Sequence, residues 1–278
     1  MADEDLDFTD RPAKSEIYDP AVARNCFQAM GKVEIISQGG NFFAENQTSD
    51  RMYLLVEGEV SLVRGKKALD VVKAGEIFGE MAAISQQPRS ATATARTPCR
   101  ALSLDGKQFQ SAIQQKSPEF ALMLMNIMIN RLRLTAAIVS KNVSATQELQ
   151  ERRVFDAKLL AELQSRMQNR LPTHAAVNKV IMKEGEGGAF MYVVLDGRVA
   201  VSIKGRTVER IGPGGVFGEM ALVDQSPRAA SATAEADCSL LSINRNDFLA
   251  LIKSNPAFAV SLLKSLAERL RYMTSHHK

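Results

Sequence analysis

The chain alternates between short apolar runs bounded by glycine and longer stretches in which apolar residues recur at helical spacing. The short runs are rich in β-branched and aromatic residues, and each pair of runs is separated by an acidic residue and a glycine, which favours hairpins of two strands. These pairs are 53–56 with 60–63 around Glu57-Gly58, and 192–195 with 199–203 around Asp196-Gly197. Rows of short strands of this kind predict a roll or barrel of the jelly-roll type.

Each group of strands is followed by a change to helical periodicity. Ser117 and Asn255 are typical N-cap residues, and each precedes a proline, which the first turn of a helix accepts. Residues 120–129 read FALMLMNIMI, about half the length of a membrane span. This segment therefore predicts a fully buried helix, and the fold class is expected to be α+β.

The sequence repeats itself at an offset of 139 residues. Residues 78–95 read FGEMAAISQQPRSATATA and residues 217–234 read FGEMALVDQSPRAASATA, with 12 of 18 positions identical. Identical pairs flank this stretch on both sides: Gly58 with Gly197, Gly75 with Gly214, Cys99 with Cys238 and, after a one-residue deletion, Arg131 with Arg269. So long a period indicates a duplicated domain rather than a solenoid.

The stretch between the repeats has a helical pattern of its own. Residues 135–171 contain no proline or glycine, and their leucines and methionine recur at mostly helical spacing. We expect an acidic tail at 1–19, a first domain at 20–134, a helical connector at 135–174 and a second domain with a C-terminal helix at 175–278. The mixed signs of the connector's charges favour a solvated face over a nucleic-acid patch.

Composition and charge narrow the class of protein. Hydrophobic residues make up 45% and charged residues 24%, which is typical of a folded soluble domain. Three cysteines are too few for a disulfide framework, and residues 1–19, with seven acids and two bases, are unlike a secretory signal, so we expect a cytoplasmic location. The three histidines lack metal-site spacing. The net charge of +4 is compatible with an anionic ligand.

The repeated stretch contains the residues of an anion clamp. A Gly-Glu-Met-Ala run after a strand can open a short helix whose first amides lack intrahelical partners. An arginine nine residues after the glutamate can return across the loop and donate charge-assisted hydrogen bonds to the same anion. The glutamate accepts only, so it suits a sugar hydroxyl. One phosphate charge and one free ribose hydroxyl together describe a 3′,5′-cyclic monophosphate.

These residues resemble the phosphate-binding cassette of the cyclic nucleotide-binding domain family, found in bacterial catabolite activator proteins, protein kinase regulatory subunits and cyclic-nucleotide-gated channels. The family pattern is FGE-[LM]-A-L, a short variable loop, and PR-[AST]-A-[ST]. Residues 78–92 and 217–231 both match it, the first with Ala83 in place of the usual leucine. The resemblance covers residues 20–134 and 175–273, and having the cassette twice in register makes it specific.

The resemblance implies a role for each position of the cassette. The two glutamates would accept from the ribose 2′-hydroxyl, the two arginines would pair with the cyclic phosphate, and the amides of Ala82, Ser90, Ala221 and Ala229 would complete the cradle. The implied ligand-binding residues are Phe78, Gly79, Glu80, Met81, Ala82, Arg89, Ser90 and Ala91 in the first repeat, and Phe217, Gly218, Glu219, Met220, Ala221, Arg228, Ala229 and Ala230 in the second. In the family a C-terminal helix covers the purine, and the candidate base caps are Arg131, Arg133, Arg269, Arg271 and Tyr272.

Two differences between the repeats bear on the ligand and the fold. In the family, alanine at the position of Ala229 goes with cAMP, whereas Ser90 supplies a hydroxyl like the threonine that goes with guanine recognition. We therefore favour cAMP and leave cGMP open at the first site. Residues 171–178 lack the glycines found at Gly31, Gly39 and Gly40, so we expect remodelled opening strands in the second repeat.

The leading hypothesis is a non-catalytic intracellular receptor that binds a cyclic nucleotide at two tandem sites and relays binding to a protein partner. The sequence contains no Walker A motif, nucleophile elbow or metal signature, so we expect neither an enzyme nor a cofactor. Two alternatives remain: a nucleotide-free scaffold built from degenerate domains, and a kinase regulatory-type subunit. Residues 1–18 argue against the second, because they are acidic and lack a basic inhibitor motif.

Two further expectations concern assembly. Only residues 273–278 follow the last predicted helix, so no direct DNA binding is expected, and the chain has no predicted membrane segment. We hypothesise a homodimer through the apolar helix at 120–138.

Overall fold

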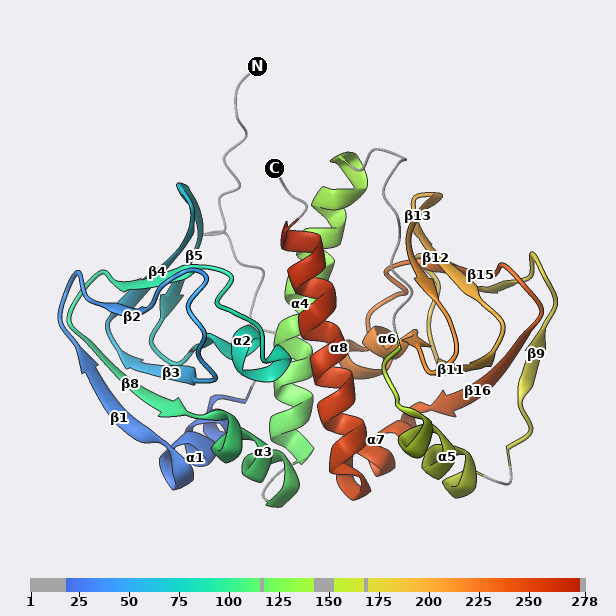
Figure 1. Cartoon of the computed structure of the whole chain (residues 1–278), viewed down its shortest axis with the longest axis horizontal. Coiled ribbons are helices and arrows are strands. Elements are labelled where there is room, and N and C mark those ends of the chain that lie inside the picture. The colour runs from blue at the N-terminus through green and yellow to red at the C-terminus, as the bar shows by residue number, and fades with distance from the viewer. Residues whose placement is uncertain (1–18, 116–117, 143–152, 168–169, 276–278) are drawn as a thin grey trace. The chain divides into compact units, whose positions relative to one another are not determined.

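The computed structural model describes residues 19–115, 118–142, 153–167 and 170–275. The chain divides into two compact units, Met1–Met123 and Leu124–Lys278. Each sequence repeat contains two four-stranded antiparallel sheets with helices before and after them, and a short helix beside the roll (Figure 1). The predicted class, tandem β-roll domains flanked by helices, is confirmed.

The first repeat begins with helix α1 and has sheets ordered β1-β8-β3-β6 and β2-β7-β4-β5. Its elements are α1 Pro20–Met30, β1 Lys32–Ile36, β2 Asn41–Phe43, β3 Met52–Glu57, β4 Glu59–Arg64, β5 Lys67–Lys73, β6 Ile77–Phe78, α2 Glu80–Ser85, β7 Thr92–Ala95, β8 Cys99–Leu104, α3 Gly106–Gln115 and α4 Pro118–Asn142. Alternate residues of β4 and β7 face inward, where Val60 and Ala93 are completely buried. Between the two sheets, Tyr53 stacks on Phe78 with ring centroids 5.1 Å apart.

The second repeat has the same sheet orders, β9-β16-β11-β14 and β10-β15-β12-β13. Its elements are α5 Ala157–Arg166, β9 Thr173–Ala175, β10 Val180–Met182, β11 Phe190–Asp196, β12 Val199–Ile203, β13 Arg206–Ile211, β14 Val216–Phe217, α6 Glu219–Asp224, β15 Ser231–Ala234, β16 Cys238–Asn244, α7 Arg245–Ser254 and α8 Pro256–Ser275. The opening strand β9 has three residues where β1 has five. The expected remodelling is found in the first of these strands, whereas β10 and β2 have three residues each.

The predicted hairpins at Gly58 and Gly197 are wrong. Strand β3 pairs with β6 and β8, whereas β4 pairs with β5 and β7, so Gly58 is a corner at which the chain leaves one sheet for the other. Gly58 has φ +95, and a Cβ atom there would lie 2.6 Å from the carbonyl oxygen of Pro98. A strand–glycine–strand pattern marks the end of a strand, but it carries no information on which neighbour the next strand pairs with.

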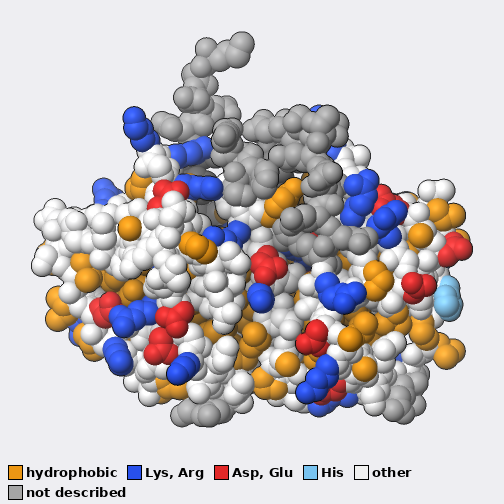
Figure 2. All heavy atoms as spheres, viewed as in Figure 1, with side chains coloured by type: hydrophobic (Ala, Val, Ile, Leu, Met, Phe, Trp, Pro, Cys, Tyr) orange, Lys and Arg blue, Asp and Glu red, His pale blue; other side chains and the backbone are white. Residues whose placement is uncertain are grey.

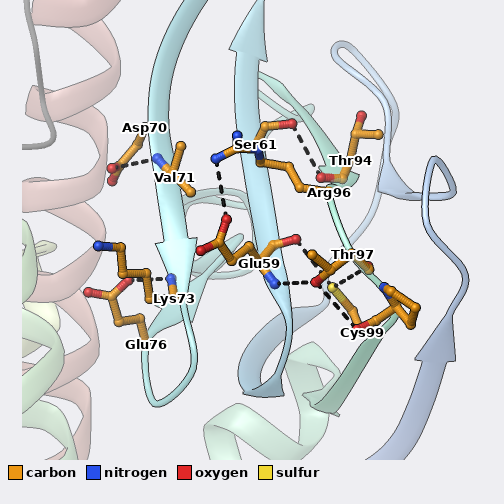
Figure 3. Close-up of polar contacts among 11 residues, drawn as sticks. Glu59, Ser61, Asp70, Val71, Lys73, Glu76, Thr94, Arg96, Thr97 and Cys99 are labelled. Carbon is orange, nitrogen blue, oxygen red and sulfur yellow. Dashed lines mark hydrogen bonds and ion pairs between the residues drawn. The ribbon is translucent and has the colours of Figure 1, made fainter.

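Side chains from the β7–β8 turn and the start of β8 hold this corner in place (Figure 3). The Glu59 amide donates to Thr97 Oγ1 over 3.0 Å, and the Cys99 thiol donates to the Glu59 carbonyl over 3.3 Å. In the second repeat the Cys238 thiol donates to the carbonyl of Arg198 over 3.3 Å. Burial raises the pKa of Cys238, so this thiol stays protonated. Cys99 and Cys238, which occupy equivalent positions in the two repeats, are therefore buried hydrogen-bond donors with a structural role. The described cysteines form no disulfide.

The helical predictions hold at several positions and fail at one. Asn255 accepts the amide of Phe258 over 3.2 Å and caps α8, whose first residue is Pro256, as predicted. Ser117 lies outside the described residues. The connector is interrupted, because Arg153–Asp156 is not helical and the amides of Val154 and Phe155 donate to the carbonyl of Gly214. Phe155 is completely buried and stacks on Phe258, so a tertiary contact overrides local helix preference there.

Helix α4 contains the apolar segment that was predicted to be buried. Within it, Phe120, Leu124, Met128 and Ile129 are completely buried and Leu132 is nearly so. These side chains are already covered within the chain, and the side chains beyond Thr135 lie outside the described residues. The homodimer through residues 120–138 stays a prediction.

The face drawn in Figure 2 does not concentrate one sign of charge, because its Lys and Arg side chains are interspersed with Asp and Glu. No helix among the described residues is long and apolar enough to span a membrane.

The corner glycines provide a test of the fold. We expect Gly197→Ala to lower the free energy of unfolding by at least about 2 kcal/mol, because φ is +88 and a Cβ atom would lie 2.3 Å from the carbonyl oxygen of Asp237. The matched control is Gly205→Ala, at φ +77 with open space around it, where the backbone cost alone is about 1 kcal/mol. Urea unfolding of both variants measures the difference. Equal losses would contradict the corner geometry.

Candidate functional site

The arginine of the first cassette is one of the most deeply buried side chains in the protein. Arg89 is 1% exposed. Its Nη1 donates to the Gly79 carbonyl over 2.7 Å, and its Nη2 donates to Ser49 Oγ and to the Arg51 carbonyl over 2.7 and 2.6 Å. The guanidinium carbon lies 4.0 Å from the centroid of the Phe43 ring. These contacts fix the guanidinium plane, but its Nε–H has no hydrogen-bond partner among the described residues.

Arg228 repeats this arrangement in the second cassette. It is 6% exposed, its Nη1 donates to the Gly218 carbonyl over 2.7 Å, and its Nη2 donates to the carbonyl of Phe190. Its Nε–H also lacks a partner within the described part of the chain. Gly188 stands at the place of Ser49, so the second site lacks the hydroxyl that Arg89 contacts.

Both arginines carry a charge that no ion pair neutralises: in the described ranges neither Arg89 nor Arg228 contacts a carboxylate closely enough to form one. Burial lowers the pKa of each, and neighbouring groups, among them Glu80 for Arg89 and Glu219 for Arg228, oppose that shift. Because the ordinary pKa of arginine is so high, both guanidinium groups stay cationic in spite of this lowering. Two buried cations of this kind are incomplete without an anion.

Glycine makes the close approach of each arginine possible. Gly79 and Gly218 cap the short helices α2 and α6 with φ near +73 and +81, and no side chain caps either helix. A Cβ atom at Gly79 would lie 2.8 Å from Arg89 Nη1, and one at Gly218 would lie 2.7 Å from Arg228 Nη1. The same glycine therefore provides the carbonyl that accepts from the arginine and the N-cap of the short helix.

Backbone hydrogen bonds fix each arginine to the loop that precedes the third strand of its repeat. The Arg89 amide donates to the Gln47 carbonyl, and the Asn46 amide donates to the Arg89 carbonyl, each over 2.9 Å. The same pair of bonds joins Arg228 to Glu186 and Gly185, also at 2.9 Å. The cassette arginine is thus held by main chain on both its backbone and its side chain.

The cassette glutamates are the first residues of α2 and α6 and are almost completely buried, at 1% for Glu80 and 3% for Glu219. Oε1 of Glu219 pairs with Nη1 of Arg269 on α8, and the same guanidinium donates to Glu209 and, over 2.7 Å, to the Val216 carbonyl. Burial alone would lower the pKa of Arg269, but the carboxylates of Glu209 and Glu219 outweigh it and raise the pKa, so Arg269 stays cationic. In the described ranges Oε2 of Glu219 makes no hydrogen bond.

A cavity lies against the second cassette. Its charged lining comes from Glu209, Glu219, Arg228 and Arg269, and Tyr272 and Met273 of α8 also line it. The remaining lining is mostly apolar: Leu132, Met182, Val201, Ile203, Val208, Ile211 and Phe217. An apolar cavity with a few convergent polar groups is typical of a site for a small organic ligand.

The candidate base caps have different surroundings. Tyr272 lines the cavity, whereas Arg269 is occupied by the two carboxylates and Arg133 by an aspartate of α6. Arg131 and Arg271 are partly buried on α4 and α8. Sequence reasoning missed three residues at the sites: Glu209 contributes a carboxylate from a strand, and Phe190 and Arg51 contribute backbone carbonyls. A backbone carbonyl is the same at every residue, so no sequence signal could have identified Phe190 and Arg51.

The described residues contain no group of three or more His, Cys, Asp and Glu side chains that could hold a metal ion. The polar groups at both sites are arginine and glutamate, which suit an organic anion with a hydroxyl group.

The chain is similar to several proteins of known family. It is 42% identical to the cyclic AMP receptor protein of Thermus thermophilus over 98 residues, which is 34% of this chain and 45% of that protein. It is 24% identical to the cAMP-dependent protein kinase regulatory subunit of Yarrowia lipolytica over 242 residues, 84% of this chain and 57% of the relative. The chain thus spans less than two thirds of the length of either curated relative.

Among solved structures, the regulatory domain of Toxoplasma gondii PKA with cAMP is 20% identical, with a TM-score of 0.33 over 94% of this chain and 91% of that one. The model of the cyclic nucleotide-binding domain family matches residues 33–116 and 172–255, which together exceed half of the chain and contain both cassettes. The chain therefore belongs to the cyclic nucleotide-binding domain family and carries two copies of the domain in tandem.

Proposed function

We propose that this protein is a non-catalytic receptor that binds one cyclic nucleotide in each repeat, with cAMP favoured, and relays binding to a protein partner. The observation that carries the proposal is the pair of buried arginines, each with an unpaired Nε–H and no carboxylate in ion-pair contact. A cyclic phosphodiester has one negative charge and exocyclic oxygens that accept from such a donor. Its single charge would neutralise the arginine at each site, whereas a phosphomonoester would bring a second negative charge.

The glutamates support a nucleotide rather than a bare anion. Glu219 retains Oε2 as an acceptor while Arg269 holds Oε1, and this orients the carboxylate toward a ligand hydroxyl. A simple anion beside Glu219 would be repelled, whereas a ribose 2′-hydroxyl would donate to it. The apolar lining of the cavity suits a purine, and Tyr272 is the side chain we propose to stack on it.

The choice of nucleotide rests on one position in each repeat. Ala229 offers no side-chain hydrogen bond, which favours cAMP at the second site. Ser90 follows Arg89 and is partly exposed, so its hydroxyl is available to a purine substituent, and we propose that the first site accepts cGMP as well as cAMP.

The relay would begin at the C-terminal helix. Arg269 of α8 is bonded to Glu219, so a ligand that engages Glu219 also acts on the residue that attaches α8 to the cassette. A protein kinase is the class of partner suggested by the regulatory subunit of Yarrowia lipolytica, which matches across both repeats. The three cysteines are buried and form no disulfide within the described residues, which suits a reducing, intracellular compartment.

Calorimetric titration tests this function directly. We expect two bound equivalents of cAMP and stabilisation by about 2.7 kcal/mol at a hundred times the dissociation constant. The same titration with cGMP and with 5′-AMP separates the cyclic phosphodiester from a monoester. If none of these ligands produces heat or a shift in melting temperature, the receptor function is wrong and the nucleotide-free scaffold is supported.

Substitution of each cassette arginine separates the sites. Arg89→Lys and Arg228→Lys keep the charge but lose the Nε–H and the fork that holds the backbone carbonyls. Each should weaken its own site about 10- to 100-fold, which reduces the measured stoichiometry from two to one. The control is Arg96→Lys, because Arg96 forms an exposed ion pair with Glu59 in the first repeat. Two full-affinity sites in both cassette variants would contradict the assignment.

The residue after the arginine tests nucleotide preference. Ser90→Ala should weaken cGMP binding at the first site about 2- to 10-fold, the worth of one hydrogen bond, and leave cAMP binding unchanged. Ala229→Ser is the reciprocal variant and should strengthen cGMP binding at the second site. Competition of each nucleotide against a fluorescent cyclic nucleotide measures both. Equal changes for the two nucleotides would show that Ser90 does not read the base.

A further inference from the structure

Helix α4 supplies an arginine to the second cassette. Arg133 Nε pairs with Asp224 Oδ2 at 2.5 Å and Nη2 with Oδ1 at 3.0 Å, while Nη1 donates to the Pro227 carbonyl over 2.9 Å. The Asp224 side chain is 6% exposed and that of Arg133 is 24% exposed. A two-point contact with little solvent access fixes the geometry more firmly than an exposed ion pair does.

The contacts of Arg133 lie at both ends of the loop that carries Arg228. Asp224 is the last residue of α6, Gln225 follows in the left-handed region with φ +54, and Pro227 immediately precedes Arg228. Asp224 Oδ1 also accepts the amide of Ser226 over 3.0 Å. One guanidinium therefore holds the start and the end of a loop whose next residue is the cassette arginine.

The first cassette differs at the residue that receives Arg133 in the second. Ser85 stands at the place of Asp224, and its hydroxyl donates to the Met81 carbonyl of its own helix over 2.6 Å. The loop backbone is otherwise alike, with Gln86 at φ +56. The duplicated sequence thus has a serine in the first cassette where the second has the carboxylate that pairs with Arg133.

Helix α4 also reaches the cavity itself. Leu132, next to Arg133, lines the cavity together with Arg228 and Tyr272. Leu132 and Arg133 belong to the second compact unit, Leu124–Lys278, so this part of helix α4 provides part of the wall and the attachment of the second site within that unit.

We propose that Arg133 is a positioning residue of the second nucleotide site. By holding Asp224 and Pro227 it fixes the loop that presents Arg228, and it makes the affinity of that site depend on helix α4. The inference rests on the proposed function, because it concerns the affinity of the same site for a cyclic nucleotide. It assigns Arg133 to the cassette loop of the second repeat instead of to a base in the first.

The experiment uses the full chain with the first site weakened by Arg89→Lys, so that high-affinity cAMP binding reports the second site alone. Arg133→Gln and Asp224→Asn are each added to this background, and so is their combination. We expect each single change to weaken cAMP binding at least about tenfold, and the combination to be no weaker than the worse single change, because the two side chains act as a pair. Arg133→Lys should fall between Arg133→Gln and the parent.

Two comparisons separate positioning from general stability. Arg166→Gln removes an exposed arginine that pairs with Glu162 in the same unit, and it should leave the dissociation constant unchanged. Arg133→Gln in the Arg228→Lys background should leave cAMP binding at the first site unchanged. A role confined to stability would lower the melting temperature of Arg133→Gln without changing the second-site dissociation constant, and this result would overturn the inference.

The parent protein distinguishes the two levels of the proposal. If the Arg89→Lys parent binds cAMP and Arg133→Gln binds it equally well, the inference is wrong and the receptor function stands. If neither the parent nor the unmodified chain binds any cyclic nucleotide, the proposed function is wrong and the inference falls with it.

Discussion

A buried guanidinium held by backbone carbonyls is the interaction on which both sites depend. Arg89 and Arg228 are covered by strands, short helices and loops that converge on them, and each is fixed by the carbonyl of the glycine that opens the cassette helix. Removing such a charge from water costs several kcal/mol unless it is compensated. Carbonyl dipoles provide part of that compensation and leave one donor and one unit of charge for a ligand. The sheets around the arginine thus maintain an anion site that is prepared before the anion arrives.

The duplication preserved this clamp and changed what surrounds it. Ser49 contacts the first arginine, whereas Gly188 occupies that place in the second repeat. The second cassette is bonded to two helices, to α8 through Arg269 and Glu219 and to α4 through Arg133 and Asp224. The first cassette helix ends in Ser85, which bonds to its own turn, where the second ends in Asp224. The two cassettes therefore share their glycine, glutamate and arginine and differ at the residues that surround them.

Much of the fold, and the position of the cassette arginines and glutamates within it, could be predicted from the sequence. The repeat, the short strands, the cap at Asn255 and the arginine–glutamate pairs depend on residue identity and spacing, and these are local properties. The corners at Gly58 and Gly197 could not be predicted, because a glycine between two strands permits a hairpin and a change of sheet equally. The break at Arg153–Asp156 was also missed, because burial of Phe155 against Phe258 decides it, and that contact joins residues about a hundred positions apart.

The sequence by itself determined the two clamps, because the glycine, glutamate and arginine types and their spacing define the donors and acceptors of each. Only the tertiary structure decided what those groups touch. It assigned Nη1 and Nη2 of each arginine to carbonyls, left Nε free, and brought Arg269 and Arg133 to carboxylates 50 and 91 positions away. The physical reason is that backbone carbonyls are the same at every residue and long-range ion pairs follow from packing, so neither is encoded in a local pattern.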